Sequence, residues 1–543
     1  MKTRRTLPWP SWRAFLMTLR FALAVAPLAA LSALGVLISG KRVRAWNRLS
    51  ALAERYPDYY RYWSRYIAQA MKRRYIGEAS EPSTVGFHEF AQSPDDTLSD
   101  CLQRLESEGH EWVVFHGSGD RLDRDIRVVI ARAGVAHAAA AIIYWDEEWM
   151  LHGETLTPWI KPDWSDWLYK ARDCLTGSCA IRLEVAAQFA SARQDLRADR
   201  FGLASLMQEM IRQGHAPVHL PLVLSRRLAP EIETDVWAQT APRLWPEWRF
   251  STRDDGVPFL RAVPPDPSTW PSVTVIIPTR DRIDLLGMCL AGLERTRYGG
   301  DLEVLVVDNA SQEPESLAFF EGLSGNLRVI RDEAPFNFSR LNNLAAAQAS
   351  GDFLCLLNND VEVLDEDWLT AMMRIAVDAS VGAVGAQLLY PDGAVQHAGV
   401  AIGMGNAAGH IQRGVDPAAV EHCAWHAVSR EVTAVTAACL LVSRAHYYSV
   451  GGLDEAGFAV AFNDVDFCLK LDAAGLTNVY CAEARLIHAE SRTRPNDYHP
   501  DQVIRFEREL SLLQSRWQTP GFNDVRYSPL LSPSSEVCLL RAG

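Results

Sequence analysis

The sequence has little that would suit a nucleic-acid partner, a zinc site or a fold stapled by disulfides. Its 543 residues carry a net charge of -13, whereas a general nucleic-acid binder shows a basic footprint. The ten cysteines are scattered, and no CxxC pair is present to hold zinc. Several cysteines sit in apolar runs, a usage that fits a reducing compartment. With 48% hydrophobic and 22% charged residues, the chain is globular and long enough for two large domains or roughly three smaller ones.

Stretches that are both apolar and uncharged over a bilayer-spanning length are also scarce, and one candidate lies near the N-terminus. The residues from Phe21 to Ser39 carry no charge, a length just sufficient to span a bilayer, although Pro27 interrupts them. Basic residues flank both ends, so the positive-inside rule assigns no orientation. A cleaved signal peptide is one alternative, but no A-x-A site follows; a helix packed on the protein itself is another. We expect residues 1–45 to form a membrane-attachment helix.

The next segment, residues 46–83, is rich in aromatic and basic side chains. The mixture of Tyr, Trp and Arg between Arg55 and Tyr75 suits a helix at the level of the lipid headgroups. A helix packed against the following domain explains the same composition. Both alternatives stay open at the level of the sequence.

Two stretches show apolar strands that alternate with helical patterns, the arrangement of βαβ units. The first covers residues 84–228. The second covers residues 271–520 and opens with a continuous β-branched run from Val273 to Pro278, which is typical of a buried parallel strand. Residues 229–270 are rich in Pro and Trp and are predicted to be a linker with a small hairpin, and residues 521–543 form a C-terminal tail. The predicted fold class is therefore α/β.

Three strands of the second stretch end in polar side chains. Phe353–Asp360 is a buried strand that ends in two amides and a carboxylate, and Asp308 and His488 close two others. In an open α/β sheet, ligands collect at the carboxyl ends of the strands. Asp360 and His488 could hold Mg²⁺ or Mn²⁺, and Asp308 could accept from a nucleobase or ribose. The alternative is that these residues only form turns after their strands.

A helix is predicted to begin at Asn463 and Asp464. Asp464 could cap this helix, with Asp466 adding a favourable dipole contribution. It could equally be a general base that takes a proton from an acceptor hydroxyl. A base together with a metal at Asp360 would define a displacement at the anomeric carbon of a sugar.

The segment from Ser272 to about Asp497 resembles the family 2 inverting glycosyltransferases, which have a GT-A fold. The matching motifs, in the order of the family, are VIIPTRD, VVDNAS, an N-x-A-x-x-x-A-x-G pattern from Asn343 to Gly351, LLNND, AFNDVDFCLKL and LIHAES. A wider set of strings, including NFSRLNN, VQHAGV and GGLDE, looks like the branch that builds O-antigen and other envelope polysaccharides, often labelled rhamnosyltransferase-like.

The resemblance implies a role for each matching residue. The nucleotide sugar would be bound by Pro278, Thr279, Asp281, Asp308, Asn343, Asn359 and Arg494. Mg²⁺ or Mn²⁺ would be held by Asp360 and His488, the catalytic base would be Asp464, and the acceptor side would include His397, His410 and Asn463. Asn358 stands where the family has the first acid of its D-x-D motif, Asn463 where it has a Glu, and the sequence around Arg494 departs from the usual S-R-G.

Residues 84–228 look like the lower half of a second, degenerate GT-A domain. Where the family shows an acid-rich strand end, this copy has His116-Gly117-Ser118-Gly119-Asp120, and its helix near Arg200–Met210 has no Glu-Asp pair. We expect this copy to be inactive, and either to bind the acceptor or to brace the catalytic domain.

The resemblance implies an inverting enzyme that moves a sugar from a UDP- or dTDP-sugar, with dTDP-rhamnose as one candidate, to a glycan or lipid-linked glycan acceptor. It would act in the synthesis of O-antigen-like polysaccharide at the cytoplasmic face of the inner membrane, either single-pass or membrane-associated. The alternative is a catalytically weak scaffold that binds glycans or nucleotide sugars, since two motif acids are replaced by amides. A nucleotidyltransferase shares the fold, but no Gly-rich, Lys-containing loop follows the first strand.

Overall fold

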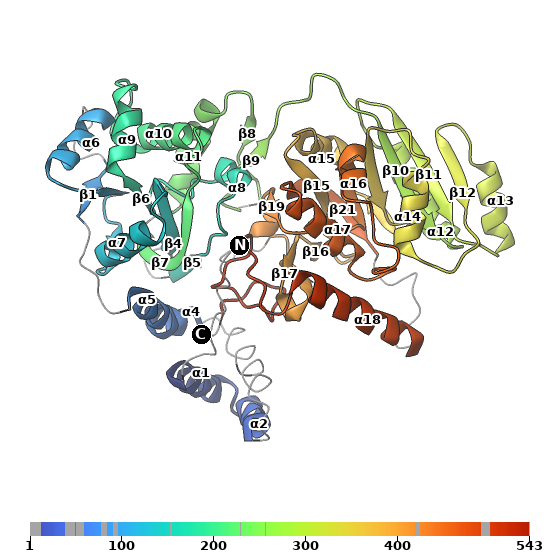
Figure 1. Ribbon diagram of the computed structural model, residues 1–543, viewed down its shortest axis with the longest axis horizontal. Helices are drawn as coiled ribbons and strands as arrows, with labels where there is room; N and C mark the ends of the chain where they lie inside the picture. The colour runs from blue at the N-terminus through green and yellow to red at the C-terminus, as the bar shows by residue number, and fades with distance from the viewer. Residues whose placement is uncertain are drawn as a thin grey trace. The chain divides into compact units, whose positions relative to one another are not determined.

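The computed structural model describes residues 12–38, 49, 59–77, 84–90, 96–151, 155–228, 230–255, 257–418, 424–489 and 500–541 (Figure 1). These residues form two compact units, each with its own sheet. The C-terminal unit contains the described residues from 263 to 524. The N-terminal unit contains those up to 262 together with residues 525–541, so the C-terminal tail belongs to the N-terminal unit.

The C-terminal unit is built on a ten-stranded mixed sheet in the order β12-β11-β10-β13-β20-β15-β21-β14, with β16 beside β15 and β19 beside β21. Its strands are β10 (Val273–Thr279), β11 (Leu302–Asp308), β12 (Leu327–Arg331), β13 (Phe353–Leu357), β14 (Val361–Val363), β15 (Val381–Leu389), β16 (Val395–His397), β19 (Arg430–Val432), β20 (Cys439–Ser443) and β21 (Thr477–His488); a separate hairpin joins β17 (Val400–Ile402) and β18 (Ala408–His410).

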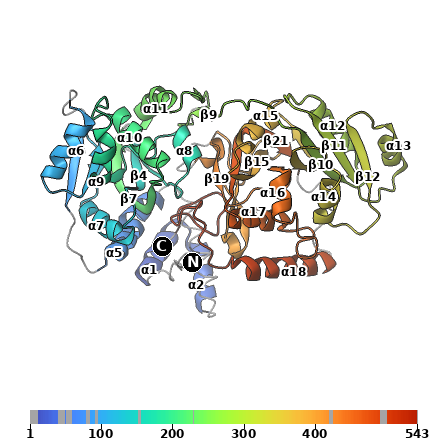
Figure 2. The ribbon, with the colours of Figure 1, turned by 45° about the horizontal axis from the view of Figure 1, so that its top comes forward.

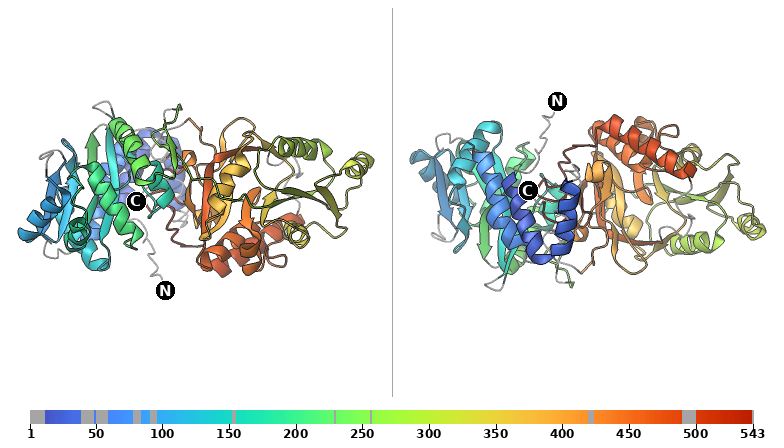
Figure 3. Two further views of the ribbon diagram at one scale, coloured as in Figure 1. Left: turned by 90° about the horizontal axis from the view of Figure 1, so that it is seen from above. Right: turned by 90° about the horizontal axis from the view of Figure 1, so that it is seen from below.

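Helices cover both faces of this sheet, as Figure 3 shows. They are α12 (Ile283–Glu294), α13 (Pro314–Gly322), α14 (Phe338–Ala346), α15 (Trp368–Ala376), α16 (Arg444–Ser449), α17 (Asn463–Ala473) and α18 (Pro500–Trp517), with short 3-10 turns η2 (Met404–Asn406) and η3 (Trp425–Ala427). Because both faces are covered, every residue of β10, β13 and β15 is buried, which explains their continuous apolar sequences. One core joins Ile276 and Leu305 of the sheet to Leu341 of α14 and Phe467 of α17.

The directions of the strands determine which strand ends share one edge of the sheet. β10, β11, β12 and β13 run parallel, whereas β20 is antiparallel to both β13 and β15. β21 is parallel to β15, and therefore runs in the same direction as β13. The carboxyl ends of β10, β11, β13 and β21 consequently lie at one edge of the sheet, although the sheet is mixed and not purely parallel.

The N-terminal unit contains a seven-stranded sheet in the order β1-β2-β6-β4-β7-β3, with β5 beside β4. Its strands are β1 (Val85–Glu89), β2 (Trp112–His116), β3 (Arg121–Leu122), β4 (Ile142–Leu151), β5 (Thr155–Trp159), β6 (Cys179–Arg182) and β7 (Val218–Leu228), and a two-stranded ribbon joins β8 (Arg249–Ser251) and β9 (Arg261–Val263). The helices are α1 (Trp12–Val25), α2 (Pro27–Ile38), α4 (Tyr59–Tyr62), the π-helix η1 (Trp63–Ala68), α5 (Gln69–Ile76), α6 (Leu98–Ser107), α7 (Ile126–Ala136), α8 (Asp166–Ala171), α9 (Leu183–Ser191), α10 (Arg200–Arg212) and α11 (Pro230–Leu244).

The two sheets repeat one another. The order β1-β2-β6-β4-β7-β3 corresponds strand for strand to β10-β13-β20-β15-β21-β14, and each neighbouring pair has the same relative direction in both units. The strands also follow the same order along the chain. Among the described residues, the N-terminal unit has no strand in the place of β11 or β12. The described N-terminal sheet therefore corresponds to the part of the C-terminal sheet from β10 to β14, without β11 and β12.

The structure differs from the expectation of a linker at residues 229–270. The predicted hairpin is present as β8 and β9, but α11 occupies much of the segment. Trp237 and Ala241 of this helix and Trp245 directly after it are buried, and the indole Nε1 of Trp237 donates to the carbonyl of Lys170. The spacing of these side chains at every fourth residue places them on one helical face, and that face packs on the N-terminal unit.

The apolar run from Phe21 to Ser39 is divided between α1 and α2, which meet at Ala26 just before Pro27. Proline cannot donate a helical hydrogen bond, which explains the break. None of the helices among the described residues has the length and apolarity needed to cross a membrane. Leu16, Leu28 and Leu31 are exposed on these two helices.

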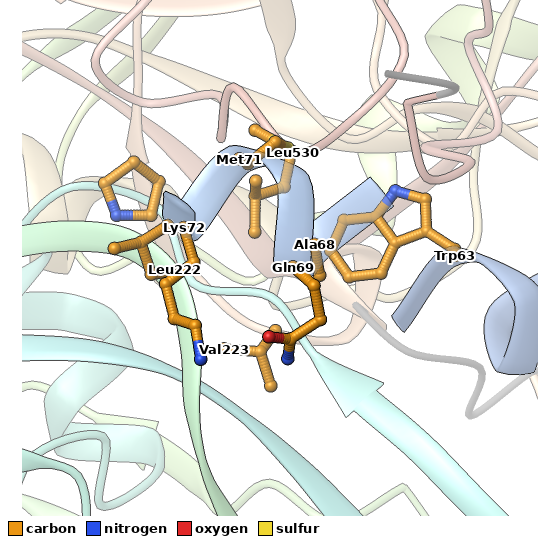
Figure 4. Close-up of a pocket in the computed structure, with 9 residues that line it drawn as sticks. Trp63, Ala68, Gln69, Met71, Lys72, Leu222, Val223 and Leu530 are labelled. Atoms are coloured by element: carbon orange, nitrogen blue, oxygen red, sulfur yellow. The ribbon is translucent and has the colours of Figure 1, made fainter. Parts of the chain in front are cut away.

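The aromatic helix after residue 58 packs against the N-terminal unit. Trp63 is fully buried and donates to the carbonyl of Arg541, and Tyr60 donates to Glu148. Lys72 forms ion pairs with Asp123 and Asp125. A small pocket lies beside these residues and is lined by Trp63, Gln69, Lys72 and Leu222 among others (Figure 4). Of the two alternatives for this segment, the described residues support the packed helix.

Candidate active site

The carboxylate of Asp360 and the imidazole of His488 meet at the edge of the C-terminal sheet. Asp360 lies between β13 and β14, and His488 is the last residue of β21, which pairs with β14. The Oδ1 atom of Asp360 is 3.1 Å from the Nε2 atom of His488, and Asn358 Nδ2 lies 3.2 Å from the same nitrogen. Both side chains are largely buried. The structure thus brings together the two residues predicted to hold a metal.

A third residue fixes the other side of the His488 ring. The Nδ1 atom of His488 is 2.7 Å from Oε1 of Gln396 in β16. The amide Nε2 of the same glutamine donates to the main-chain carbonyl of His488 at 3.3 Å. The imidazole is therefore held at both nitrogens. Motif reasoning singled out the string VQHAGV for its histidine and missed the contribution of this glutamine.

The predicted nucleoside side forms a connected set of contacts at the ends of β10 and β11. Asn359 donates from its side chain to the hydroxyl of Thr279 at 3.0 Å. The main-chain N–H of Asp281 donates to Ser311 Oγ at 2.7 Å, and the N–H of Ser311 donates to Asp308 Oδ1 at 2.9 Å. These contacts join the loop after β10 to the loop after β11, with Pro278 and Thr279 as the last residues of β10.

Asp308 already has a cationic partner. Its Oδ2 accepts from Arg331 at the end of β12, and Arg331 also donates to the carbonyl of Ser311. Asp308 is buried, whereas the side chain of Arg331 is 41% exposed. A ligand at this edge would therefore meet Arg331 as well as Asp308, and Arg331 is a further residue that sequence reasoning did not identify.

Asp464 sits at the start of α17 with its carboxylate held by main-chain donors. Its Oδ2 accepts from the N–H of Ala437 at 3.1 Å, and its Oδ1 accepts from the N–H of Val465 at 2.8 Å. Burial raises the pKa of Asp464, although these bonds and one from the Thr436 hydroxyl oppose the shift. A raised pKa makes the carboxylate a better proton acceptor. The helix cap itself is Phe462, so capping does not explain Asp464.

The segment from Thr436 to Ala438 connects this base to the metal edge. Ala437 binds the carboxylate of Asp464, and the carbonyl of the next residue, Ala438, accepts from the N–H of Asn358 at 3.0 Å. Asn358 in turn contacts His488. The predicted base and the predicted metal ligands are therefore linked by one short piece of backbone.

Asn463 and Asp466, the neighbours of Asp464 in the motif, are occupied in holding the fold. Asn463 is buried and donates to the carbonyl of Val460 at 2.6 Å. Asp466 is fully buried and accepts from Arg516 and Trp517 of α18. Asp464 is therefore distinguished from Asp466 by its partners, which belong to Thr436, Ala437 and Val465 and not to α18.

Unusual backbone conformations gather at the same edge. Asp281 and Arg282 after β10, Ala310 after β11 and Phe462 before α17 have φ values of 50°, 50°, 55° and 60°. Left-handed conformations are unfavourable for residues other than glycine, and they persist where the surrounding structure imposes them, often at functional sites. Their positions agree with the placement of the site at this edge.

The remaining predicted residues have mixed positions. His397 is buried in β16, with its Nδ1 2.9 Å from Nδ1 of His410 in β18. Asn343 binds the loop before α17, where it donates to the carbonyl of Leu453 and accepts from Tyr447. Arg494 lies outside the described residues. The roles of these side chains in binding a donor or acceptor stay predictions.

Comparison with known proteins identifies the domain to which this edge belongs. Residues 274–433 match the family Glycosyl transferase family 2. The chain carries a family 2 glycosyltransferase domain. The mixed sheet with helices on both faces is accordingly the GT-A fold, and the predicted fold class is confirmed.

The chain is similar to longer proteins over much of its length. It is 38% identical over 454 residues to the uncharacterized protein y4gI of Sinorhizobium fredii, covering 78% of this chain and 48% of that protein. It is 33% identical over 471 residues to the O-antigen biosynthesis protein RfbC of Myxococcus xanthus, covering 83% and 36% respectively. An N-acetylglucosaminyltransferase of Mesorhizobium japonicum is 32% identical over 143 residues, 26% of this chain and 34% of its own length. The chain spans half or less of the length of these relatives.

The likeness to solved structures is weak. The mannosyltransferase PcManGT of Pyrobaculum calidifontis, in complex with GDP-Man and Mn²⁺, is 16% identical, with 61% of this chain and 79% of that chain covered and a TM-score of 0.34. GalNAc-T7, with UDP, GalNAc and Mn²⁺, is 14% identical, with 46% and 50% covered and a TM-score of 0.36.

In the N-terminal unit, an arginine lies beside the acid that corresponds to Asp360 of the glycosyltransferase domain. Asp120 lies between β2 and β3 as Asp360 lies between β13 and β14. The guanidinium of Arg227 is 3.4 Å from Asp120 and 3.3 Å from Glu147, and all three side chains are buried. A fixed cation of the protein therefore neutralises these acids.

Proposed function

We propose that the glycosyltransferase domain transfers a sugar from a nucleotide-diphospho-sugar to an acceptor hydroxyl with inversion at the anomeric carbon. The observation that carries this proposal is the pairing of a base-like carboxylate, Asp464, with the Asp360–His488 pair through the backbone at Thr436–Ala438. Inverting transfer needs a base on the acceptor side and charge neutralisation on the donor side.

Asp464 would deprotonate the acceptor hydroxyl as its oxygen attacks the anomeric carbon. The bond between that carbon and the diphosphate oxygen breaks, and the nucleoside diphosphate leaves. The pKa of Asp464 is raised by burial, which brings its basicity closer to that needed for proton transfer. The direct displacement inverts the configuration of the sugar.

Asp360 and His488 fit a divalent cation, Mg²⁺ or Mn²⁺. Among the described residues no group of three or more His, Cys, Asp and Glu side chains is arranged to hold a metal ion, so the protein would offer two ligands and leave the others to phosphate oxygens and water. Oxygen and imidazole donors suit Mn²⁺. When bound, such a cation would neutralise the charge on the leaving diphosphate.

On the nucleotide side, we infer that Asp308, Asp281 and Thr279 face the nucleoside at the ends of β10 and β11. Asp308 can accept from a base or ribose, and the exposed guanidinium of Arg331 beside it suits a phosphate or a base edge. UDP-sugars and dTDP-sugars, dTDP-rhamnose among them, are the candidate donors.

The acceptor is proposed to be a glycan or a lipid-linked glycan of an envelope polysaccharide. The similarity to a protein named for O-antigen biosynthesis supports this class. The exposed leucines of α1 and α2 and the basic residues around them support attachment to the cytoplasmic face of the inner membrane, where nucleotide sugars are made. A reporter fused after Gly543 that proved periplasmic would contradict this location.

The test is turnover of the full chain with Mn²⁺ or Mg²⁺ and a panel of UDP-, dTDP- and GDP-sugars. We expect release of one nucleoside diphosphate in the presence of a lipid-linked acceptor, and a product of inverted configuration by NMR. Binding of a nucleotide sugar without any release would instead support the alternative of a non-catalytic scaffold, which the amide replacements at Asn358 and Asn463 keep in view.

A further inference from the structure

The side chain of Gln396 contacts His488 at the edge of the C-terminal sheet. It lies in β16, beside β15 and away from β21 in the strand order, yet its side chain reaches the last residue of β21. It is 4% exposed. Both polar atoms of its amide bind the same residue: Oε1 faces His488 Nδ1 at 2.7 Å, and Nε2 faces the His488 carbonyl at 3.3 Å.

The second of these contacts fixes which way the amide points. A main-chain carbonyl can only accept, so the atom of Gln396 that faces it must be the donor Nε2. The opposite orientation would place two acceptor oxygens against each other. Oε1 must then be the atom that faces the ring of His488.

The orientation of the amide in turn fixes the tautomer of the histidine. An amide oxygen can only accept, so the Nδ1 atom of His488 must carry a hydrogen. In the neutral ring the lone pair then lies on Nε2. That nitrogen faces Oδ1 of Asp360 at 3.1 Å and Nδ2 of Asn358 at 3.2 Å. A lone pair and a carboxylate oxygen converge on one point, an arrangement that a cation stabilises.

We propose that Gln396 is a positioning residue that holds His488 as the Nδ1–H tautomer and thereby prepares Nε2 to bind the divalent cation of the donor site. The inference rests on the proposed metal-assisted transfer. A partner that accepts from the second nitrogen of a metal-binding histidine orients the ring and tunes its affinity, and loss of such a partner costs roughly 10- to 100-fold in metal binding. Gln396 does not touch the donor or the acceptor in this proposal.

The test measures metal binding directly on the full chain. Mn²⁺ affinity is determined from the EPR signal of the free ion, with the metal alone and with inorganic pyrophosphate added. We expect Gln396→Leu to weaken Mn²⁺ binding roughly 10- to 100-fold. Gln396→Glu should weaken binding less than Gln396→Leu, because a carboxylate still accepts from Nδ1–H although it loses the donor to the His488 carbonyl.

Gln387 provides a matched control. It lies in β15, is 5% exposed, and its Nε2 donates to the carbonyl of His426 at 2.8 Å. Gln387→Leu removes a similarly buried amide and its hydrogen bond to a main-chain carbonyl. It therefore reports how far the loss of such an amide alone affects the protein. We expect it to leave Mn²⁺ affinity unchanged.

A second measurement needs no substitution at Gln396. Long-range ¹H–¹⁵N correlation on metal-free wild-type protein labelled with ¹⁵N-histidine reports which ring nitrogen carries hydrogen, with the His488 signals assigned by their loss in His488→Ala. A hydrogen on Nδ1 and a bare Nε2 support the proposal. A hydrogen on Nε2 overturns it.

The outcomes separate this inference from the function on which it rests. If His488→Ala weakens Mn²⁺ binding and Gln396→Leu does not, the role of Gln396 is wrong and the metal site stands. If neither substitution changes Mn²⁺ binding, both the role of Gln396 and the metal assignment in the proposed function are wrong.

Discussion

At the scale of single residues, Asp464 and Asp466 belong to the same motif but have different surroundings, which indicate different roles. Asp464 and Asp466 both lie in the first turn of α17, where either could stabilise the helix by its charge. Asp466 is fully enclosed and bound by Arg516 and Trp517. Asp464 accepts from the N–H groups of Ala437 and Val465 and from the Thr436 hydroxyl, and no cation is bound to it among the described residues, so its carboxylate is better suited than that of Asp466 to accept a proton.

We therefore expect Asp464→Asn to lower kcat by roughly 10²- to 10⁴-fold, the usual contribution of a general base. Mn²⁺ affinity should not change, because Asp464 does not contact Asp360 or His488. Asp472→Asn on the same helix is the control and should retain activity. Steady-state kinetics with the identified donor checks this prediction, and full transfer activity in Asp464→Asn would rule out this base.

The pH dependence of transfer should reflect the same carboxylate. Burial raises the pKa of Asp464, and the base acts only when deprotonated, so kcat/KM should fall as the pH drops through that raised pKa. The acidic limb should thus lie above the range of an ordinary aspartate. Thr436→Val removes a hydrogen bond that lowers the pKa of Asp464, and should move the limb to still higher pH. A limb that stays in place in Thr436→Val would contradict the assignment.

At the scale of elements, α18 holds the loop that leads into α17, and Figure 2 shows the two helices near each other. Leu513 of α18 belongs to the core of the C-terminal unit. Glu509 is fully buried, and its carboxylate accepts from the N–H groups of residues 459–461. The loop continues into Phe462, with its left-handed backbone, and then into Asp464. The position of Asp464, the proposed base, therefore depends on contacts with α18, which follows later in the chain.

Glu509→Gln should disturb this arrangement because an amide has a single acceptor oxygen and would turn a donor toward a main-chain N–H. Leaving one buried donor unpaired costs about 1–3 kcal/mol, so we expect a lower melting temperature together with a reduced kcat. Glu507→Gln, an exposed change on the same helix, should alter neither. A destabilised Glu509→Gln enzyme with wild-type kcat would show that the loop does not position the base.

At the scale of the whole molecule, the two units share a strand order but differ in which strands are added to it. The C-terminal unit has β11 and β12, which carry the predicted nucleoside contacts, whereas the described N-terminal unit has no strands in their place. Its acid at the equivalent strand end, Asp120, is paired with Arg227. We infer that, within the part of the chain that the structure describes, the donor site belongs to the C-terminal unit, and that the N-terminal copy serves in binding or support.

Asp120→Asn should accordingly lower stability without affecting transfer. It removes one of the carboxylates that neutralise the buried Arg227, at a cost of about 1–3 kcal/mol. The number of Mn²⁺ ions bound per chain should stay at one. Asp360→Asn is the matched change in the other unit, and should abolish Mn²⁺ binding with little loss of stability. Two bound ions in the wild type, reduced to one by Asp120→Asn, would contradict this view.

The N-terminal helices provide a test of membrane attachment. Leu28 and Leu31 of α2 are 84% and 55% exposed, and burying such side chains in a lipid surface is favourable. Leu28→Asp combined with Leu31→Asp should reduce flotation of the protein with vesicles of phosphatidylethanolamine and phosphatidylglycerol. Val135→Asp, at a residue of α7 that is 83% exposed, should leave flotation unchanged. Unaltered flotation of the double variant would refute attachment through α2.

The sequence by itself determined the order of the strands along the chain and the motif residues that follow them. β10, β11 and β13 were predictable because strands buried on both faces are continuously apolar and end abruptly in polar residues. The repeat in residues 84–228 was visible from the same pattern in Trp112–Asp120. The helix α11 was missed because its Pro and Trp content concealed a helical face, and helical periodicity is weak over few residues.

Only the tertiary structure decided which of these residues meet. The pairing of β21 with β14 places His488 on Asp360, the reach of Gln396 across the sheet edge orients that histidine, and Arg227 meets Asp120 through the pairing of β7 with β3. Such contacts join residues more than ninety positions apart, and local sequence carries no signal for them. They arise from the register of distant strands, which is set by packing of the whole core.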